Sequence, residues 1–151
     1  MNFLKTGISV RVIGRDEPEM VEIRCHEEDE NVREIVAFVK SRQGVLSGND
    51  GGNRYEIPVA DVIYIESVDS RTFLYTSDRT YETRQKLYEL EEQLRPRKFL
   101  RISKAMIVNL MKVESLRPAL NGRFAARLTT GEDVIVSRSF VPGLKETLRG
   151  G

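Results

Sequence analysis

Basic side chains crowd into one stretch of this sequence, and the chemistry open to them is the binding of anions. Between Arg95 and Gly131 there are nine lysines and arginines and a single acid, Glu114, a local charge of +8 in a chain whose net charge is +1. Residues 1–44 carry seven basic and nine acidic residues instead. Clustered cations gain affinity for nucleic acid because binding releases the counterions of its phosphates. The distribution favours an anion-binding face, with a merely solvated surface as the alternative.

Residues that catalyse reactions or bind metals are scarce. His26 is the one histidine and Cys25 the one cysteine, too few for a zinc site of standard spacing or for a serine or cysteine relay. Neighbouring residues of a strand point to opposite faces, which argues against a thiolate pair between these two. The glycine-rich stretch 47–53 lacks the Lys-Ser/Thr pair and the helix that a phosphate-cradling loop needs. We therefore expect no enzyme, no metal and no cofactor.

Length and composition indicate a globular protein of the cytoplasm. The chain has 151 residues, 40% hydrophobic and 31% charged, which suits one domain with a small appendage. No apolar run approaches the roughly 20 residues that span a bilayer. The first eight residues lack the pattern of a secretion signal, and a single cysteine fits a reducing compartment.

The first 44 residues are predicted to form a small ββα unit. Apolar and polar residues alternate over 8–12 and again over 21–25, which is the period of half-buried strands, and a turn lies between them. Asn31 is predicted to cap a helix whose apolar residues recur at helical spacing from Val32 to Val39. Gly44 would end it. We expect this unit to serve dimerisation or control.

Strands dominate the remainder of the chain. The turn-rich stretch 45–53 is interpreted either as a linker or as the tip of a hairpin. Val62–Ile65 is a continuous apolar run, typical of a strand buried on both faces. Asn121-Gly122 is the strongest hairpin signal, because both residues accept a positive φ. Helices are expected over Arg84–Leu94 and Ser139–Leu148. The pattern predicts a β-rich α+β fold.

One combination of motifs resembles a known family. Residues 99–109 read FLRISKAMIVN, and after the Asn121-Gly122 turn a strand ends at Val136 before Ser137-Arg138-Ser139-Phe140. In this order and spacing the pieces resemble the LytTR family of DNA-binding domains, over about Asn53 to Leu148. The resemblance implies multi-stranded antiparallel sheets with short helices over residues 54–151.

The resemblance also implies which residues approach DNA. In the family, three loops rather than a recognition helix enter successive grooves. The matching positions and their neighbours here are Ser70, Arg71, Arg101, Ser103, Lys104, Arg138 and Ser139. Arginine and lysine donate hydrogen bonds to guanine or phosphate, and the serine hydroxyl can pair with donor or acceptor groups on a base edge. The alternatives are a solvated turn residue for Arg71 and helix caps for Ser103 and Ser139. Asn109 is expected to secure the backbone.

These inferences predict a sequence-specific regulator of transcription that binds double-stranded DNA with repeated half-sites, as a homodimer. Residues 1–44 are too short for a receiver domain, so we expect no phosphorylation gating through one. Short family members of similar build are thought to be held by a membrane-protein neighbour, which makes such a partner a further expectation. The alternatives are an interaction module whose basic face docks an acidic partner and a small enzyme built around Cys25 and His26.

Overall fold

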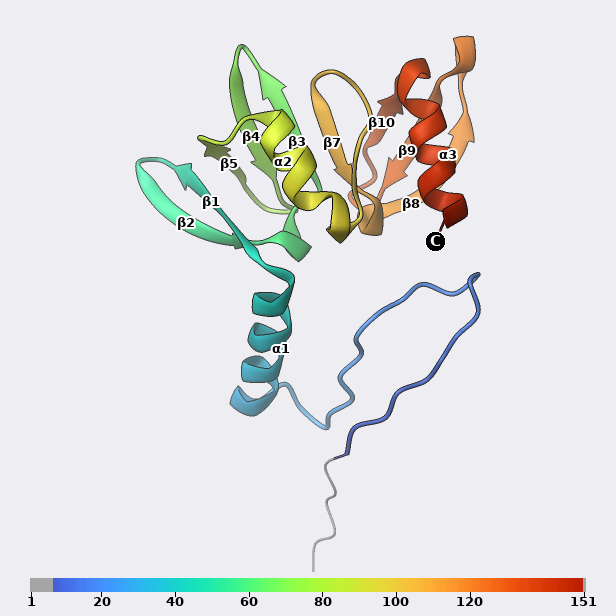
Figure 1. The fold of residues 1–151 in the computed structure, drawn as a ribbon. Coiled ribbons are helices and arrows are strands. Elements are labelled where there is room, and N and C mark those ends of the chain that lie inside the picture. The colour runs from blue at the N-terminus through green and yellow to red at the C-terminus, as the bar shows by residue number, and fades with distance from the viewer. Residues whose placement is uncertain (1–6, 151) are drawn as a thin grey trace, which may run out of the picture.

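The computed structural model describes residues 7–150, apart from the side chains of residues 40, 41 and 43. Its strands are β1 (Val45–Asp50), β2 (Asn53–Pro58), β3 (Tyr64–Val68), β4 (Arg71–Tyr75), β5 (Thr80–Thr83), β6 (Phe99–Arg101), β7 (Met106–Asn109), β8 (Val113–Pro118), β9 (Phe124–Leu128) and β10 (Asp133–Val136). Its α-helices are α1 (Glu30–Gln43), α2 (Leu87–Leu94) and α3 (Val141–Gly150). The strands form two antiparallel sheets, ordered β2-β1-β5-β4-β3-β7-β6 and β10-β9-β8 (Figure 1). The predicted β-rich fold with short helices is confirmed.

Two hydrophobic cores hold these layers together, and one short segment serves both. Val62 and Ile65 pack with α2 on one face of the larger sheet, in the first core. Ile63 and Tyr64 face the smaller sheet and α3, in the second core. All four side chains are buried, as the continuous apolar run predicts. The larger sheet is therefore the middle layer of the domain.

Two tight turns connect strands where the sequence places them. Asn121 and Gly122 have φ values of +61° and +74° between β8 and β9, which confirms the predicted hairpin. Gly51 and Gly52 also have positive φ and join β1 to β2, strands that pair along their whole length. Residues 45–53 thus lie in a hairpin of the larger sheet and are not a linker.

The helices follow the predicted apolar stripes but differ at their ends. Leu87, Leu90 and Leu94 of α2 are buried against the larger sheet. This helix begins three residues later than expected, because the Glu89 carboxylate accepts a hydrogen bond from the Lys86 backbone N–H at 2.8 Å and caps it there. A 3₁₀ turn over Arg138–Phe140 precedes α3.

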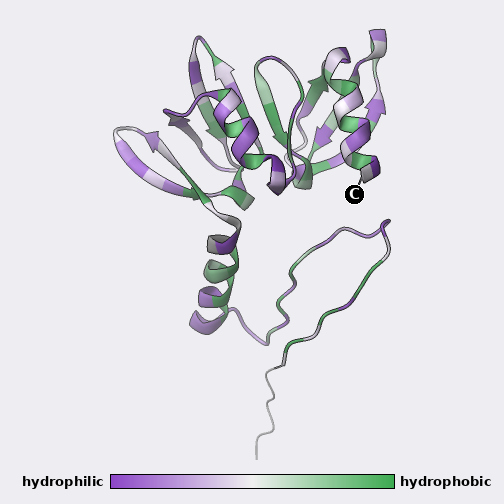
Figure 2. Ribbon diagram, in the orientation of Figure 1, coloured by the Kyte–Doolittle hydropathy of each residue, from purple (hydrophilic) through white to green (hydrophobic). Residues whose placement is uncertain are grey.

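The N-terminal segment corrects part of the prediction. Helix α1 is present. The Asp29 carboxylate caps it by accepting a hydrogen bond from the Val32 N–H at 3.0 Å, so the cap is Asp29 and not Asn31. Residues 8–12 and 21–25 are extended but form no strands within the described chain. Their apolar residues find no surface to cover in one copy of the chain: Val10 is 87% exposed. Figure 2 shows hydrophobic stretches along this segment.

Candidate nucleic-acid interface

The three loops expected to approach DNA lie along one edge of the molecule. In Figure 1 the β3–β4 turn, the β6–β7 turn and the start of α3 share the upper edge. Backbone hydrogen bonds join them: the Ser67 N–H donates to the Ala105 carbonyl, and the Ser137 N–H donates to the Ile102 carbonyl, both at 2.8 Å. The fold therefore brings together segments that are far apart in sequence. We call this edge the turn edge.

The first loop is a two-residue turn that exposes Ser70. Asp69 and Ser70 have φ values of +51° and +64°, the left-handed backbone of a tight hairpin turn. The Arg71 side chain is 61% exposed, as the alternative of a solvated turn residue expects, but it also pairs within the protein. Its guanidinium donates two hydrogen bonds to the Glu82 carboxylate, at 2.6 and 3.1 Å, and lies over the Phe73 ring. These bonds lower the pKa of Glu82 and raise that of Arg71.

The second loop is held from behind by Arg101. The guanidinium donates to the backbone carbonyls of Ser103 and Lys104 and to the Glu91 carboxylate, at 2.7, 2.5 and 2.8 Å. Only 20% of the Arg101 side chain is exposed. The Ser103 hydroxyl accepts from the Ala105 N–H and closes the turn, with no helix for it to cap. Arg101 therefore positions the loop, and Lys104 is its exposed cation.

The third loop presents Arg138 and Ser139, both exposed in the 3₁₀ turn before α3. Ser139 lies inside this turn and is not a helix cap. A Cβ at Gly122 would lie 3.0 Å from Cδ of Arg138, so the glycine of the β8–β9 turn leaves room for that side chain. Within residues 7–150, the side chains of Lys104 and Arg138 have no hydrogen-bond or ion-pair partner. Two cations of the turn edge are thus available to a ligand.

One buried and one partly buried polar contact fix the framework behind the turn edge. Asn109 is 2% exposed, its amide donates to the Val62 carbonyl at 2.8 Å and its oxygen accepts from the Met111 N–H. This confirms that Asn109 secures the backbone. The Tyr64 hydroxyl donates to Glu132, in the turn between β9 and β10, at 3.2 Å. Burial and this carboxylate raise the pKa of Tyr64, and the contact ties the two sheets together.

The basic stretch 95–131 does not form the single face expected from its charge. Five of its cations are paired with acids outside the stretch: Arg95 with Glu92, Lys98 with Glu19, Arg101 with Glu91, and Arg117 and Arg127 with Asp133. The 3₁₀ turn Arg95–Arg97 continues α2 to the edge opposite the turn edge (Figure 1). Folding thus places four acids against five of the nine cations and offsets half of the local charge of +8.

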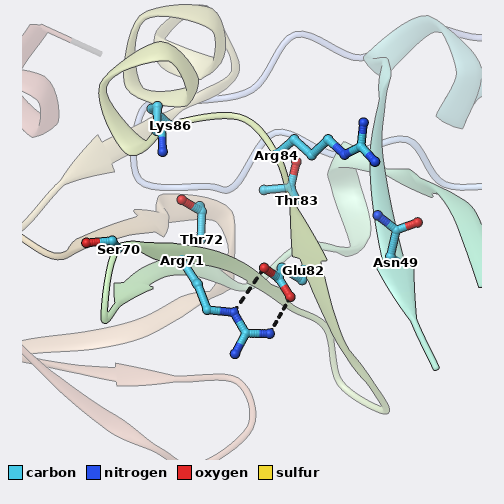
Figure 3. Close-up of a pocket in the computed structure, with 8 residues that line it drawn as sticks. All are labelled: Asn49, Ser70, Arg71, Thr72, Glu82, Thr83, Arg84 and Lys86. Carbon is cyan, nitrogen blue, oxygen red and sulfur yellow. Dashed lines mark hydrogen bonds and ion pairs between the residues drawn. The ribbon is translucent and has the colours of Figure 1, made fainter. Parts of the chain in front are cut away.

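Two cations beside the first loop were not predicted from the sequence as binding residues. Arg84 and Lys86 are exposed in the connection between β5 and α2 and line a groove with Ser70, Thr72 and Thr83 (Figure 3). The sequence pattern assigned both to the helix and gave no reason to separate them from other helical cations. Their place beside Ser70 extends the basic surface of the turn edge.

Other chemistry has little support in the described residues. Cys25 and His26 are both exposed in the extended N-terminal segment. Over residues 7–150, no three side chains of the metal-binding types group together. In the same range, every helix is too short or too polar to cross a membrane.

Comparisons with known proteins show the family and the fold. Residues 52–149 match the family model of the LytTr DNA-binding domain. The chain is 31% identical over 130 residues to an uncharacterized HTH-type transcriptional regulator of Staphylococcus aureus, covering 85% of this chain and 88% of the relative. It is 29% identical over 93 residues to the sensory transduction protein LytT of Bacillus anthracis, covering 62% and 38%. Among solved structures, the LytTr DNA-binding domain of a Bacillus cereus protein described as a methyl-accepting/DNA response regulator superposes with a TM-score of 0.65 and 25% identity, over 71% of this chain and 97% of that one.

Proposed function

The chain belongs to the LytTr DNA-binding domain family, and from this we propose that it regulates transcription by reading a specific sequence of double-stranded DNA with its turn edge. The observation that carries the proposal is the pair Lys104 and Arg138. Both are exposed cations without protein partners, on turns that backbone hydrogen bonds join. An arginine or lysine that reaches a guanine discriminates against the wrong base by about 1–3 kcal/mol.

The arrangement of the helices supports reading by turns. Helix α2 packs on the larger sheet, and α3 packs in the second core with the smaller sheet. The two do not follow each other as a helix-turn-helix pair within the described chain. The turns of the turn edge instead project beyond the sheets. Arg101 holds the backbone at Lys104, and Gly122 leaves room for Arg138, the two residues that would enter the grooves.

Several features of the regulator are part of the same proposal. It acts in the cytoplasm, as a homodimer on repeated half-sites, and residues 1–44 do not gate it in the way a phosphorylated receiver would. Residues 1–44 provide pairing or control, because their exposed apolar side chains are suited to burial against a second surface. These residues are 67–97% exposed: Ile8, Val10, Val12, Met20 and Val21. A regulatory membrane-protein partner would contact this same segment.

Selection of bound duplexes from a random pool, followed by titration of the full chain at several salt concentrations, tests the proposal. If about four to six phosphates are neutralised per subunit, the logarithm of the affinity should fall with the logarithm of the salt concentration at a slope of roughly −4 to −5. Enrichment of one motif together with this slope supports the proposal. A pool that stays random, or no binding at low salt, contradicts it and favours a module that docks an acidic protein.

A further inference from the structure

The groove beside the first loop combines hydroxyl groups and cations on one face of the larger sheet. Thr72 of β4 and Thr83 of β5 are paired in register, on the face that carries α2. Lys86 and Arg84 lie at the start of that helix, and Ser70 completes the wall. In Figure 3 the side chain of Lys86 points toward the two threonines, whereas Arg71 points to the other side of the strands, where it pairs with Glu82.

Thr72 is the most informative residue of this groove. Its side chain is only 5% exposed, and within residues 7–150 its hydroxyl has no hydrogen-bond partner. No buried side-chain nitrogen or oxygen of the described residues lacks a partner, so this unpaired hydroxyl is not sealed in the core. It opens on the groove, where its O–H can donate to a bound group. The Thr83 hydroxyl accepts from the Gln85 N–H at 3.4 Å and keeps its own hydrogen for donation.

The charges of the groove specify an anion. Arg84 and Lys86 are exposed and, in the part of the chain that the structure describes, neither takes part in an ion pair. Glu82 is the one acid among the lining residues, and Arg71 already holds its carboxylate. The two hydroxyl donors and Lys86 face the hollow, while Arg84 lines it and points toward Asn49 (Figure 3). This set matches the several acceptor oxygens and the negative charge of a phosphate group.

We propose that this groove binds one backbone phosphate of DNA, on the strand that flanks the duplex groove entered by the first loop. The inference rests on the proposed function, which supplies the DNA, and adds residues that the family resemblance does not assign. Ser70 belongs to both the loop and the groove wall. A phosphate bound here would therefore fix the depth and angle at which the first loop enters its groove.

Titrations of full-length variants against the selected duplex and a scrambled one test the proposal. Lys86→Gln and Arg84→Gln should each weaken binding to both duplexes alike, roughly 5–10-fold near 0.1 M salt, and each should reduce the salt slope by about 0.9. Thr72→Val should weaken both without changing the slope. Arg95→Gln, which alters a cation at the other end of α2 that is paired with Glu92, should change neither. Unchanged affinity and slope in folded Lys86→Gln and Arg84→Gln would overturn the proposal.

Duplexes with single methylphosphonates identify the bound group. At one position the methylphosphonate should weaken DNA binding by the wild-type protein about as much as Lys86→Gln does. It should not weaken DNA binding by Lys86→Gln any further. The proposal is wrong if no position shows this. It is also wrong if millimolar inorganic phosphate raises the melting temperature of the wild type but not of Lys86→Gln while the two proteins bind DNA with equal affinity, because the groove is then a site for a free anion. Failure of the wild type to bind any duplex would instead refute the proposed function.

Discussion

The guanidinium of Arg101 and the backbone carbonyl of Lys104 are joined by a hydrogen bond of 2.5 Å. Sequence pattern suggests both residues as DNA contacts, yet their side chains have opposite surroundings. The Arg101 side chain is enclosed by protein groups, including the Glu91 carboxylate at 2.8 Å, whereas Lys104 is exposed. We therefore expect Arg101 to position the loop and Lys104 to contact DNA.

Glu91→Gln distinguishes positioning from contact. Loss of the carboxylate should release Arg101, loosen the loop around Lys104 and weaken DNA binding several-fold, although a negative charge has been removed. It should also lower the free energy of unfolding by about 1–3 kcal/mol, since a charged hydrogen bond is lost. Tighter DNA binding by Glu91→Gln would mean that the freed Arg101 touches DNA. Glu92→Gln, on the same helix, is the control.

Asn109 should matter for stability and not for recognition. Asn109→Ala leaves the Val62 carbonyl and the Met111 N–H without their side-chain partner in a buried place, which typically costs about 1–3 kcal/mol per unsatisfied group. Urea denaturation should show this loss. Where the variant is folded, its preference for the selected duplex over the scrambled one should equal that of the wild type, and a changed preference would speak against a purely structural role.

Asp133 gives the smaller sheet an acid-dependent contribution. Hydrogen bonds from Arg127 and then Arg117 lower its pKa from 3.8 to about 2. A carboxyl group with a depressed pKa stabilises the fold fully above its ordinary pKa, and this stabilisation is lost as the pH falls through the folded value. The melting temperature of Asp133→Asn should therefore fall less between pH 4 and pH 2 than that of the wild type. Parallel curves would contradict the pairing, and Asp16→Asn in the N-terminal segment serves as the control.

Local signals predicted much of this fold, and the misses share a physical cause. The Asn121-Gly122 turn and the buried run Val62–Ile65 depend on backbone preference and on apolar content, both visible in a few residues. The alternation over 8–12 shows that one face is apolar but not what covers it. The extended segment accordingly forms no strand in a single chain.

The site shows the same division. The positions of the three loops follow from their motifs, but the partners of the charges do not, because Lys98 pairs with Glu19 and Arg101 with Glu91 across the fold. Summing charge along the sequence therefore overstated the basic face. The groove at Lys86 was missed because it depends on where α2 begins, a boundary set by one capping contact.

The exposed apolar residues of the N-terminal segment lead to a prediction about assembly. Val10→Asp should not lower the melting temperature of a monomer, because the side chain is 87% exposed. If residues 1–44 pair two copies, the variant should dissociate at concentrations where the wild type sediments as a dimer. Ser9→Asp places the same charge on the other face of the extended chain and should leave the dimer intact. Identical sedimentation of Val10→Asp and wild type would remove this segment from the pairing surface.

A comparison of Lys104→Ala and Arg138→Ala on selected and scrambled duplexes tests whether the turn edge reads DNA. If both side chains reach base edges, each change should cost about 1–3 kcal/mol on the selected duplex and little on the scrambled one, so that specificity collapses. Lys145→Ala, in α3 where the ammonium lies over the Phe124 ring, should change little. Melting curves confirm that each variant is folded. Wild-type affinity and specificity in both folded loop variants would show that DNA does not bind at the turn edge.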